Sequence, residues 1–343
     1  MAGRSDVNNL RTIVETTLVP HTAFEDATQR LEQCFAYASG ASEPICIALV
    51  GESRTGKSRV LEECFSRHPR IRNANGLNTP ILRVKTPSKP TVKSLAELML
   101  RALGDPKAHT GSENTKTARL LTLMVESGVM MVMIDEFQHF YDKGSHKVMH
   151  HVADWLKILV DDARVALVVA GLPTCRAVIE QNEQLAGRFL SPVYMPRFNW
   201  QDIDQREEFI AILGAFQESI GQCFDLPRFT GDEMAFRFYC GTGGLIGYLS
   251  KFLRQAVWNA IDANSKSIDL SSLLRAHSQS IWAQDGPTGL PSPFDRRFST
   301  EVTDDLLARI NKIGVPADEV RIPRNRAARQ TGELGVQAVL TAR

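Results

Sequence analysis

The sequence lacks the marks of membrane-bound, secreted and zinc-ribbon proteins. No apolar run is longer than six residues, whereas a membrane-spanning helix needs about 20. Residues 1–10 contain no apolar block, so we expect no secretory signal. The six cysteines include no CxxC pair, which argues against a zinc ribbon or a disulfide scaffold and favours a reducing compartment. We therefore expect a cytoplasmic protein without a membrane partner.

The chain also lacks a net charge of either sign. Forty basic residues face 39 acidic ones, which leaves +1. The charge is unevenly distributed, however, because residues 67–120 hold eleven Lys and Arg against three Asp and Glu. This segment carries +8 and the rest of the chain −7. Such segregation indicates a face for a polyanion. A solvated surface balanced by acids from elsewhere in the fold explains it equally well.

Apolar runs and helical patterns alternate in the first two thirds of the chain. With 343 residues, 43% hydrophobic and 23% charged, the composition is that of a globular protein of one or two domains. Strands that alternate with helices predict an α/β fold, with a parallel sheet flanked by helices. We expect the strands at residues 45–50, 81–84, 129–134, 165–170 and 193–195.

The strand signal stops after residue 196, and only helical patterns follow. Glycine and proline crowd into residues 286–293, which predicts a linker, and an arginine-rich stretch with two further prolines predicts a partner-binding tail. We therefore divide the chain into a helical segment 1–40, an α/β domain 41–199, an all-helical domain 200–284 and a linker with tail 285–343.

One motif identifies a nucleotide site. Residues 51–58 read Gly-Glu-Ser-Arg-Thr-Gly-Lys-Ser, which matches G-x-x-x-x-G-K-[ST] between a predicted strand and a predicted helix. The backbone N–H groups of such a loop surround phosphate oxygens. Lys57 would reach the β- and γ-phosphates of ATP, and the Ser58 hydroxyl would bind Mg²⁺. The predicted nucleotide-binding residues are Gly51, Glu52, Ser53, Arg54, Thr55, Gly56, Lys57 and Ser58.

Two carboxylates complete the predicted chemistry. Asp135 ends the strongest apolar strand, and Glu136 follows at once. Behind a phosphate loop, Asp135 would hold Mg²⁺ and Glu136 would orient and deprotonate the attacking water. The two motifs together predict ATP hydrolysis, and not binding alone.

The order of the motifs resembles that of AAA+ ATPases. An arginine stands in Leu185-Ala-Gly-Arg-Phe189, after the Asp-Glu pair and the fourth strand and before the helical domain. The resemblance implies that residues 200–284 form a lid. It also implies that Arg188 is an arginine finger, a catalytic residue that reaches the γ-phosphate of the adjacent subunit in an oligomer. A guanidinium supplied in this way neutralises the charge that develops on the transferring phosphate.

Within AAA+, the chain resembles the TniB/TnsC family of ATP-dependent regulators of DNA transposition. The resemblance spans residues 20–285 and is carried by the phosphate loop, Ile134-Asp-Glu-Phe-Gln-His139, Ala170-Gly-Leu-Pro-Thr174 and Gly243-Gly-Leu-Ile-Gly247. It implies a bacterial, nucleoid-associated protein that forms rings or filaments on double-stranded target DNA, recruits and activates a transposase, and disassembles on hydrolysis. It also implies a target-selecting adaptor, which in some relatives receives the target from a CRISPR effector.

Two features depart from the AAA+ pattern. The lid stretch 244–248 has no arginine, although many AAA+ proteins use one there to touch the nucleotide, and Lys251 is the candidate replacement. The polar sensor at the end of the fourth strand is also unclear. Thr174 is the candidate sensor, and the sequence supports equally a role at the start of the next helix.

We expect contacts with DNA at phosphates. A protein that coats duplex DNA without selecting a sequence must bind the sugar–phosphate backbone, which is the same at every sequence. Family analogy points to residues at loops and helix starts, and the alternative is that these lysines only solubilise the surface. The DNA-binding candidates are Lys89, Lys93, Thr115, Lys116, Lys143 and Lys147.

Two rival functions are a STAND-type switch, which the missing repeat array disfavours, and a helicase loader or initiator.

Overall fold

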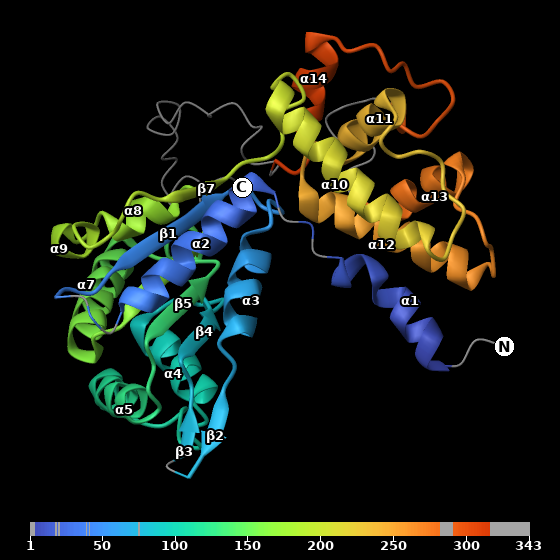
Figure 1. Ribbon diagram of the computed structural model, residues 1–343. Coiled ribbons are helices and arrows are strands. Elements are labelled where there is room, and N and C mark those ends of the chain that lie inside the picture. The colour runs from blue at the N-terminus through green and yellow to red at the C-terminus, as the bar shows by residue number, and fades with distance from the viewer. Residues whose placement is uncertain are drawn as a thin grey trace, which may run out of the picture.

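The computed structural model describes residues 4–315 except 18, 20, 39, 41, 75 and 282–290. A parallel sheet has helices on both faces, and a bundle of helices lies beside it (Figure 1). The predicted α/β fold class is confirmed, and each strand begins and ends within two residues of its predicted bounds. The strand order is β4 (Ile81–Lys85), β5 (Met131–Asp135), β6 (Ala166–Gly171), β1 (Cys46–Gly51) and β7 (Val193–Met195).

The strands are buried on both faces, which is why they read as continuous apolar runs. Val50 and Ile134 point into one layer of helices, and their neighbours Leu49 and Met133 point into the other. The first layer contains α4 (Val92–Ala102), α5 (Glu113–Glu126), α6 (His139–Asp142), α7 (His146–Ala163), α8 (Cys175–Ile179) and α9 (Glu183–Ala186). The second contains α2 (Thr22–Tyr37) and α3 (Lys57–Arg67).

The helical bundle that follows β7, which we call the lid, has a core rich in aromatic side chains. Phe209, Phe238 and Phe252 are fully buried there and lie in edge or tilted contact with neighbouring rings. Among the described residues, no helix is long and apolar enough to cross a membrane. The bundle is built from α10 (Ile203–Gly221), α11 (Asp232–Thr242), α12 (Ile246–Asp262) and α13 (Leu270–Ser280).

The predicted N-terminal segment 1–40 is not one unit. Its first helix, α1 (Arg4–Thr16), packs against α10 and α12, and Val14 belongs to the core of the lid. The second helix, α2, packs instead on the sheet and on α3. The N-terminal region therefore contributes to both parts of the molecule.

The predicted linker and tail 285–343 also needs correction. Residues 291–315 are part of the lid, because Phe294, Phe298 and Leu306 are buried in its core together with the helix α14 (Asp304–Ile310). Burial of these apolar side chains outweighs the glycine and proline content of the segment. Residues 285–290 and 316–343, to which the linker and partner-binding predictions also apply, lie outside the described residues.

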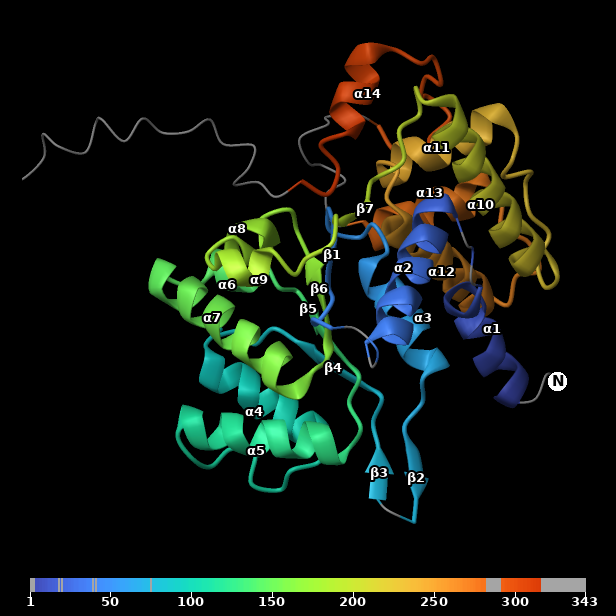
Figure 2. The ribbon, with the colours of Figure 1, turned by 60° about the vertical axis from the view of Figure 1, so that its left-hand side comes forward.

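A short hairpin was not predicted. Strands β2 (Ile71–Asn73) and β3 (Gly76–Asn78) pair antiparallel after α3 and extend away from the sheet and from the lid (Figures 1 and 2). Strands of three residues leave too little periodicity to be recognised in a sequence.

Candidate functional site

The predicted phosphate loop joins β1 to α3 at the carboxyl edge of the sheet. A Cβ atom on Gly51 would lie 2.2 Å from the main-chain oxygen of Met195, so only glycine fits there. Gly56 has a φ of +102°, in the region that glycine adopts most easily, and stands at the N-cap of α3. Both glycines of the motif are therefore required by the geometry of the turn.

Lys57 is the first residue of α3, and its ammonium group points back into the loop. Its Nζ donates to the main-chain oxygen of Gly51 at 2.8 Å and to that of Glu52. The pKa of Lys57 lies below its usual value, because the effect of burial is larger than the opposing effect of the nearby Glu136 and Asp135. A cavity of about 360 Å³ lies over the loop and is lined by Lys57, Ser58, Glu136 and residues of the lid and loop.

The two predicted Mg²⁺ ligands meet. The Ser58 hydroxyl donates to Oδ2 of Asp135 at 2.8 Å, although the two residues are 77 positions apart. Asp135 is buried, and its main-chain oxygen accepts hydrogen bonds from the backbone and the hydroxyl of Thr86. A hydroxyl and a carboxylate are oxygen ligands of the kind that Mg²⁺ prefers. The pair fits a Mg²⁺ site next to the phosphate loop.

Glu136 is held in an unusual backbone conformation. Its φ of +56° lies in the left-handed region that a non-glycine residue rarely adopts. Its N–H donates to Oδ1 of Asp135, and Nε2 of Gln138 donates to its carboxylate. Gln138 is buried and also accepts a hydrogen bond from the backbone of Leu172, after β6. Gln138 was not predicted, although it stands in the segment 134–139 that carries the family resemblance.

The lid touches the loop directly. The N–H of Gly247, in the first turn of α12, donates to the main-chain oxygen of Arg54 at 2.8 Å. The Arg54 guanidinium lies over the ring of Tyr248, 4.6 Å from its centre. Burial and the nearby Arg54 and Arg254 lower the pKa of Lys251, the candidate replacement for the missing lid arginine.

Arg197, which was not predicted, joins the loop to the lid from the residues after β7. Its guanidinium pairs with the carboxylate of Glu52 in the loop, with Nε at 3.0 Å from Oε1. It also donates to the main-chain oxygens of Gly243, after α11, and of Ile313, after α14. One side chain thus contacts three segments that are far apart in the sequence.

Thr174 stands at the N-cap of α8, but its side chain does not cap that helix. Among the described residues, its buried Oγ1 has no hydrogen-bond partner. Thr174 therefore stands at the start of the helix, as the alternative expects, but its hydroxyl does not cap that helix. The sensor role remains a prediction.

Arg188 lies at the opposite edge of the sheet from the phosphate loop. The N–H of Cys46, the first residue of β1, donates to its main-chain oxygen. Its guanidinium pairs with Asp161 of α7, with Nη2 at 2.9 Å from Oδ2. Arg188 therefore does not reach the cavity of its own chain. This position is the one expected of a residue that acts on the adjacent subunit, and the finger role remains a prediction.

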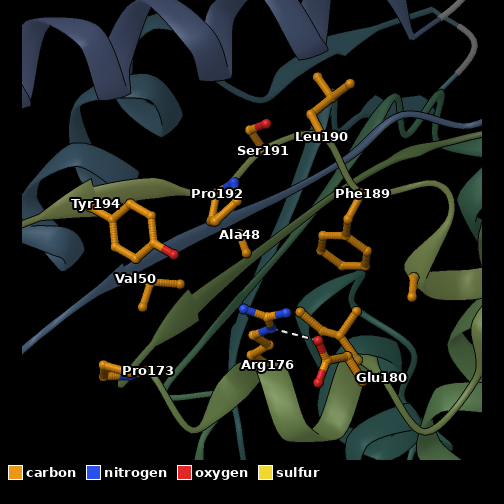
Figure 3. Close-up of a pocket in the computed structure, with 12 residues that line it drawn as sticks. Ala48, Val50, Pro173, Arg176, Glu180, Phe189, Leu190, Ser191, Pro192 and Tyr194 are labelled. Carbon is orange, nitrogen blue, oxygen red and sulfur yellow. Dashed lines mark hydrogen bonds and ion pairs between the residues drawn. The ribbon is translucent and has the colours of Figure 1, made fainter.

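An apolar groove of about 530 Å³ lies between β1, β7 and α8 (Figure 3), and its lining includes the residue that follows Arg188. Phe189 and Pro192 line it, and an ion pair of Arg176 with Glu180 borders it. Leu190 and Tyr194, at its rim, are 50% and 61% exposed. This side of the molecule thus presents apolar surface to solvent.

The predicted DNA-binding residues divide into two groups. The side chains of five are exposed, at loops or first turns after β4 and β5 and at the start of α5, namely Lys89, Lys93, Lys143, Lys147 and Thr115. Lys116 does not fit the prediction, because its side chain is fully buried. Its Nζ pairs with Glu97 at 2.9 Å and donates to the main-chain oxygen of Ala108. Lys116 links α4, α5 and the loop between them.

Comparisons with known proteins fit this arrangement. The model of the family described as "Bacterial TniB protein" matches residues 9–200. Comparison with curated protein sequences finds no match.

Several solved structures have a similar fold. The ORC2 protein of Aeropyrum pernix, solved as ADPNP–ADP complexes, is 15% identical, with a TM-score of 0.59 over 80% of this chain and 72% of that chain. Cdc6p from Pyrobaculum aerophilum is 13% identical, with a TM-score of 0.58 over 82% and 74% of the two chains. The ORC1 protein of Aeropyrum pernix in complex with DNA is 16% identical, with a TM-score of 0.55 over 80% and 70%. The fold is therefore similar to that of these ORC and Cdc6 proteins.

Replacing Lys116 should lower stability. In Lys116→Ala, Glu97 and the Ala108 carbonyl lose their partner, so we expect the free energy of unfolding to fall by about 1–3 kcal/mol. Lys93→Ala, at an exposed position in the same basic segment, is the control and should change it by less than about 0.5 kcal/mol. Urea denaturation measures both. Wild-type stability of Lys116→Ala would show that the buried pair contributes nothing.

Proposed function

We propose that this chain, which belongs to the TniB family, hydrolyses ATP in the cavity over residues 51–58. The hydrogen bond between Ser58 and Asp135 carries the proposal, because it brings together the hydroxyl and the carboxylate that P-loop ATPases use to hold Mg²⁺. The similar ORC2 structure contains ADPNP and ADP, which further supports a nucleotide in this cavity.

The residues of the cavity have distinct roles in this reaction. Phosphate oxygens of ATP would take the place of the carbonyl oxygens that now accept hydrogen bonds from Lys57. Ser58 and Asp135 would hold Mg²⁺, which when bound neutralises charge on the β- and γ-phosphates. Glu136 would orient the attacking water and accept its proton, while Gln138 keeps the carboxylate of Glu136 in place.

Glu136→Gln should separate binding from turnover. The amide cannot accept the proton of the attacking water, so we expect ATP hydrolysis to fall by about 100-fold or more. Binding of a fluorescent ATP analogue should persist, because Lys57 and the loop are intact. Lys57→Ala is the comparison and should lose binding itself, since the phosphate charge loses its counter-charge. Hydrolysis by Glu136→Gln at the wild-type rate would contradict the role of Glu136.

The active form that we propose is an oligomer in which Arg188 serves the cavity of the neighbouring copy. Arg188 lies at the opposite sheet edge from its own phosphate loop, so a copy stacked on that edge would complete the neighbour's site. The groove with the exposed Leu190 and Tyr194 adjoins Arg188 and would form part of the contact. Asp161, which now pairs with Arg188, would release it toward the γ-phosphate.

Arg188→Ala should leave a chain that binds ATP as a monomer but does not hydrolyse it. Loss of an arginine finger lowers turnover by about 10³–10⁵-fold, and we expect assembly with ATP to be lost as well. Light scattering and phosphate release measure the two effects. Arg275→Ala, an exposed position in α13 of the lid, controls for the loss of one surface arginine. An Arg188→Ala variant that assembles and hydrolyses ATP like the wild type would show that this surface does not form the contact between copies.

We further propose that the assembly forms on double-stranded DNA and recruits a transposase, with a target-selecting adaptor as a third partner. Membership of the TniB family favours this over a STAND-type switch or a helicase loader. Exposed lysines around the carboxyl ends of β4 and β5 supply positive charge for phosphates. Disassembly would follow hydrolysis, because loss of the γ-phosphate removes the counter-charge of Arg188.

The double variant Lys93→Ala, Lys147→Ala tests the DNA surface. Each lost phosphate contact should reduce the slope of log affinity against log salt by about 0.9, so the double variant should bind duplex more weakly and with a shallower slope. Fluorescence anisotropy with ATP across a salt series measures both. Lys266→Ala, an exposed lysine between α12 and α13, is the control. Equal slopes in the double variant and the wild type would place the DNA surface elsewhere.

A further inference from the structure

Three side chains of metal-ligand type meet between α2 and α3. Glu32 comes from α2, Cys64 comes from α3, and His68 is the C-cap residue that follows α3. Their ligand atoms all lie within 4.8 Å of one another. Cys64 lies on the face of α3 that packs against α2. His68, directly after the end of α3, reaches Glu32 of the same helix α2.

The three side chains are already held in place. Cys64 is fully buried, while Glu32 and His68 are mostly covered. Nε2 of His68 lies 2.8 Å from Oε2 of Glu32, and the ring of Phe35 stacks on the imidazole at 3.8 Å between centres. A site whose ligands are positioned in advance loses little side-chain entropy when an ion binds.

The Glu32 carboxylate also has capacity to spare. Its Oε1 is buried and has no hydrogen-bond partner among the described residues. Nη1 of Arg67 lies 3.8 Å from this oxygen, but Arg67 pairs more closely with Glu63, at 3.0 Å. Arg67 would therefore keep a carboxylate partner if Glu32 turned to another cation.

We propose that Glu32, Cys64 and His68 bind a transition-metal ion of the Zn²⁺ type. Thiolate and imidazole ligands select such ions over Mg²⁺ and Ca²⁺, which prefer oxygen ligands throughout. On binding, the Cys64 thiol gives its proton to solvent and its sulfur bonds the metal. The thiolate and the carboxylate then balance the two charges of the ion, while the imidazole is neutral. Water supplies the fourth ligand of a tetrahedral site.

The ion would fasten α2 to the helix that begins with Lys57. Cys64 stands in the last turn of α3 and His68 is its C-cap, so the two lie roughly 10–17 Å from Lys57 at the helical rise per residue. The site is therefore separate from the cavity over the phosphate loop, and it does not depend on ATP hydrolysis. Its effect would be to stiffen the packing of α2 on α3.

Cobalt titration of the full chain tests the proposal without nucleotide. Co²⁺ should bind one equivalent and give a thiolate-to-cobalt charge-transfer band, and Zn²⁺ should then abolish the band by displacement. Cys64→Ser should remove the band. Cys34→Ser, at the other buried cysteine in this layer, and Cys223→Ser, at an exposed cysteine, should both keep it.

Glu32→Gln supplies a second variant that leaves the buried cysteine intact. Loss of a direct ligand should weaken Co²⁺ binding by more than about tenfold, since even a supporting hydrogen bond accounts for that much. The absence of the charge-transfer band in the wild type overturns the proposal by itself. A band that survives in Cys64→Ser, or wild-type affinity in Glu32→Gln, overturns this ligand set.

Discussion

The hydrogen bond between Ser58 and Asp135 is the contact on which the candidate site depends. Asp135 ends β5 and Ser58 follows β1, and β6 lies between these strands, so the contact exists only because all three strands end at one edge of the sheet. The parallel pairing fixes this edge, with Ile134 opposite Val169 and Val50 opposite Gly171. A shift of one residue in either pairing would point every side chain of that strand to the opposite face of the sheet, and it would separate the hydroxyl from the carboxylate. The burial of both sheet faces therefore also determines the chemistry.

The sheet and the phosphate loop could be predicted because their signals are local. Runs of apolar residues that end in glycine or acid mark buried strands, and residues 51–58 need only their own backbone to form the loop. Lys116 shows where a local interpretation failed. It stands four residues before Leu120 and eight before Met124, which are both buried, so the helical spacing already placed it on the apolar face of α5. The charge of Lys116 therefore lies in the interior and not on a surface that could face DNA.

Other parts of the site depend on contacts that no local pattern contains. Arg197 reaches backbone oxygens at positions 243 and 313, and any residue type can supply a backbone oxygen. The segment 291–315 looks like a linker by composition, yet Phe294 and Phe298 enter a core formed by helices that precede it. Whether Phe294 and Phe298 are buried depends on the shape of the cavity that the other helices form, and a single sequence does not show that shape.

The position of Arg197 has a thermodynamic consequence. Arg197 holds both the main-chain oxygen of Ile313 and the carboxylate of Glu52 in the phosphate loop. A partner that binds the segment around Ile313 more tightly once Arg197 has moved away would therefore also favour the arrangement in which Glu52 is released. Linkage is reciprocal, so a nucleotide that prefers one arrangement of that loop must change the partner's affinity by the same factor. The C-terminal part of the lid is thus positioned to report the state of the loop to a protein that never touches the nucleotide.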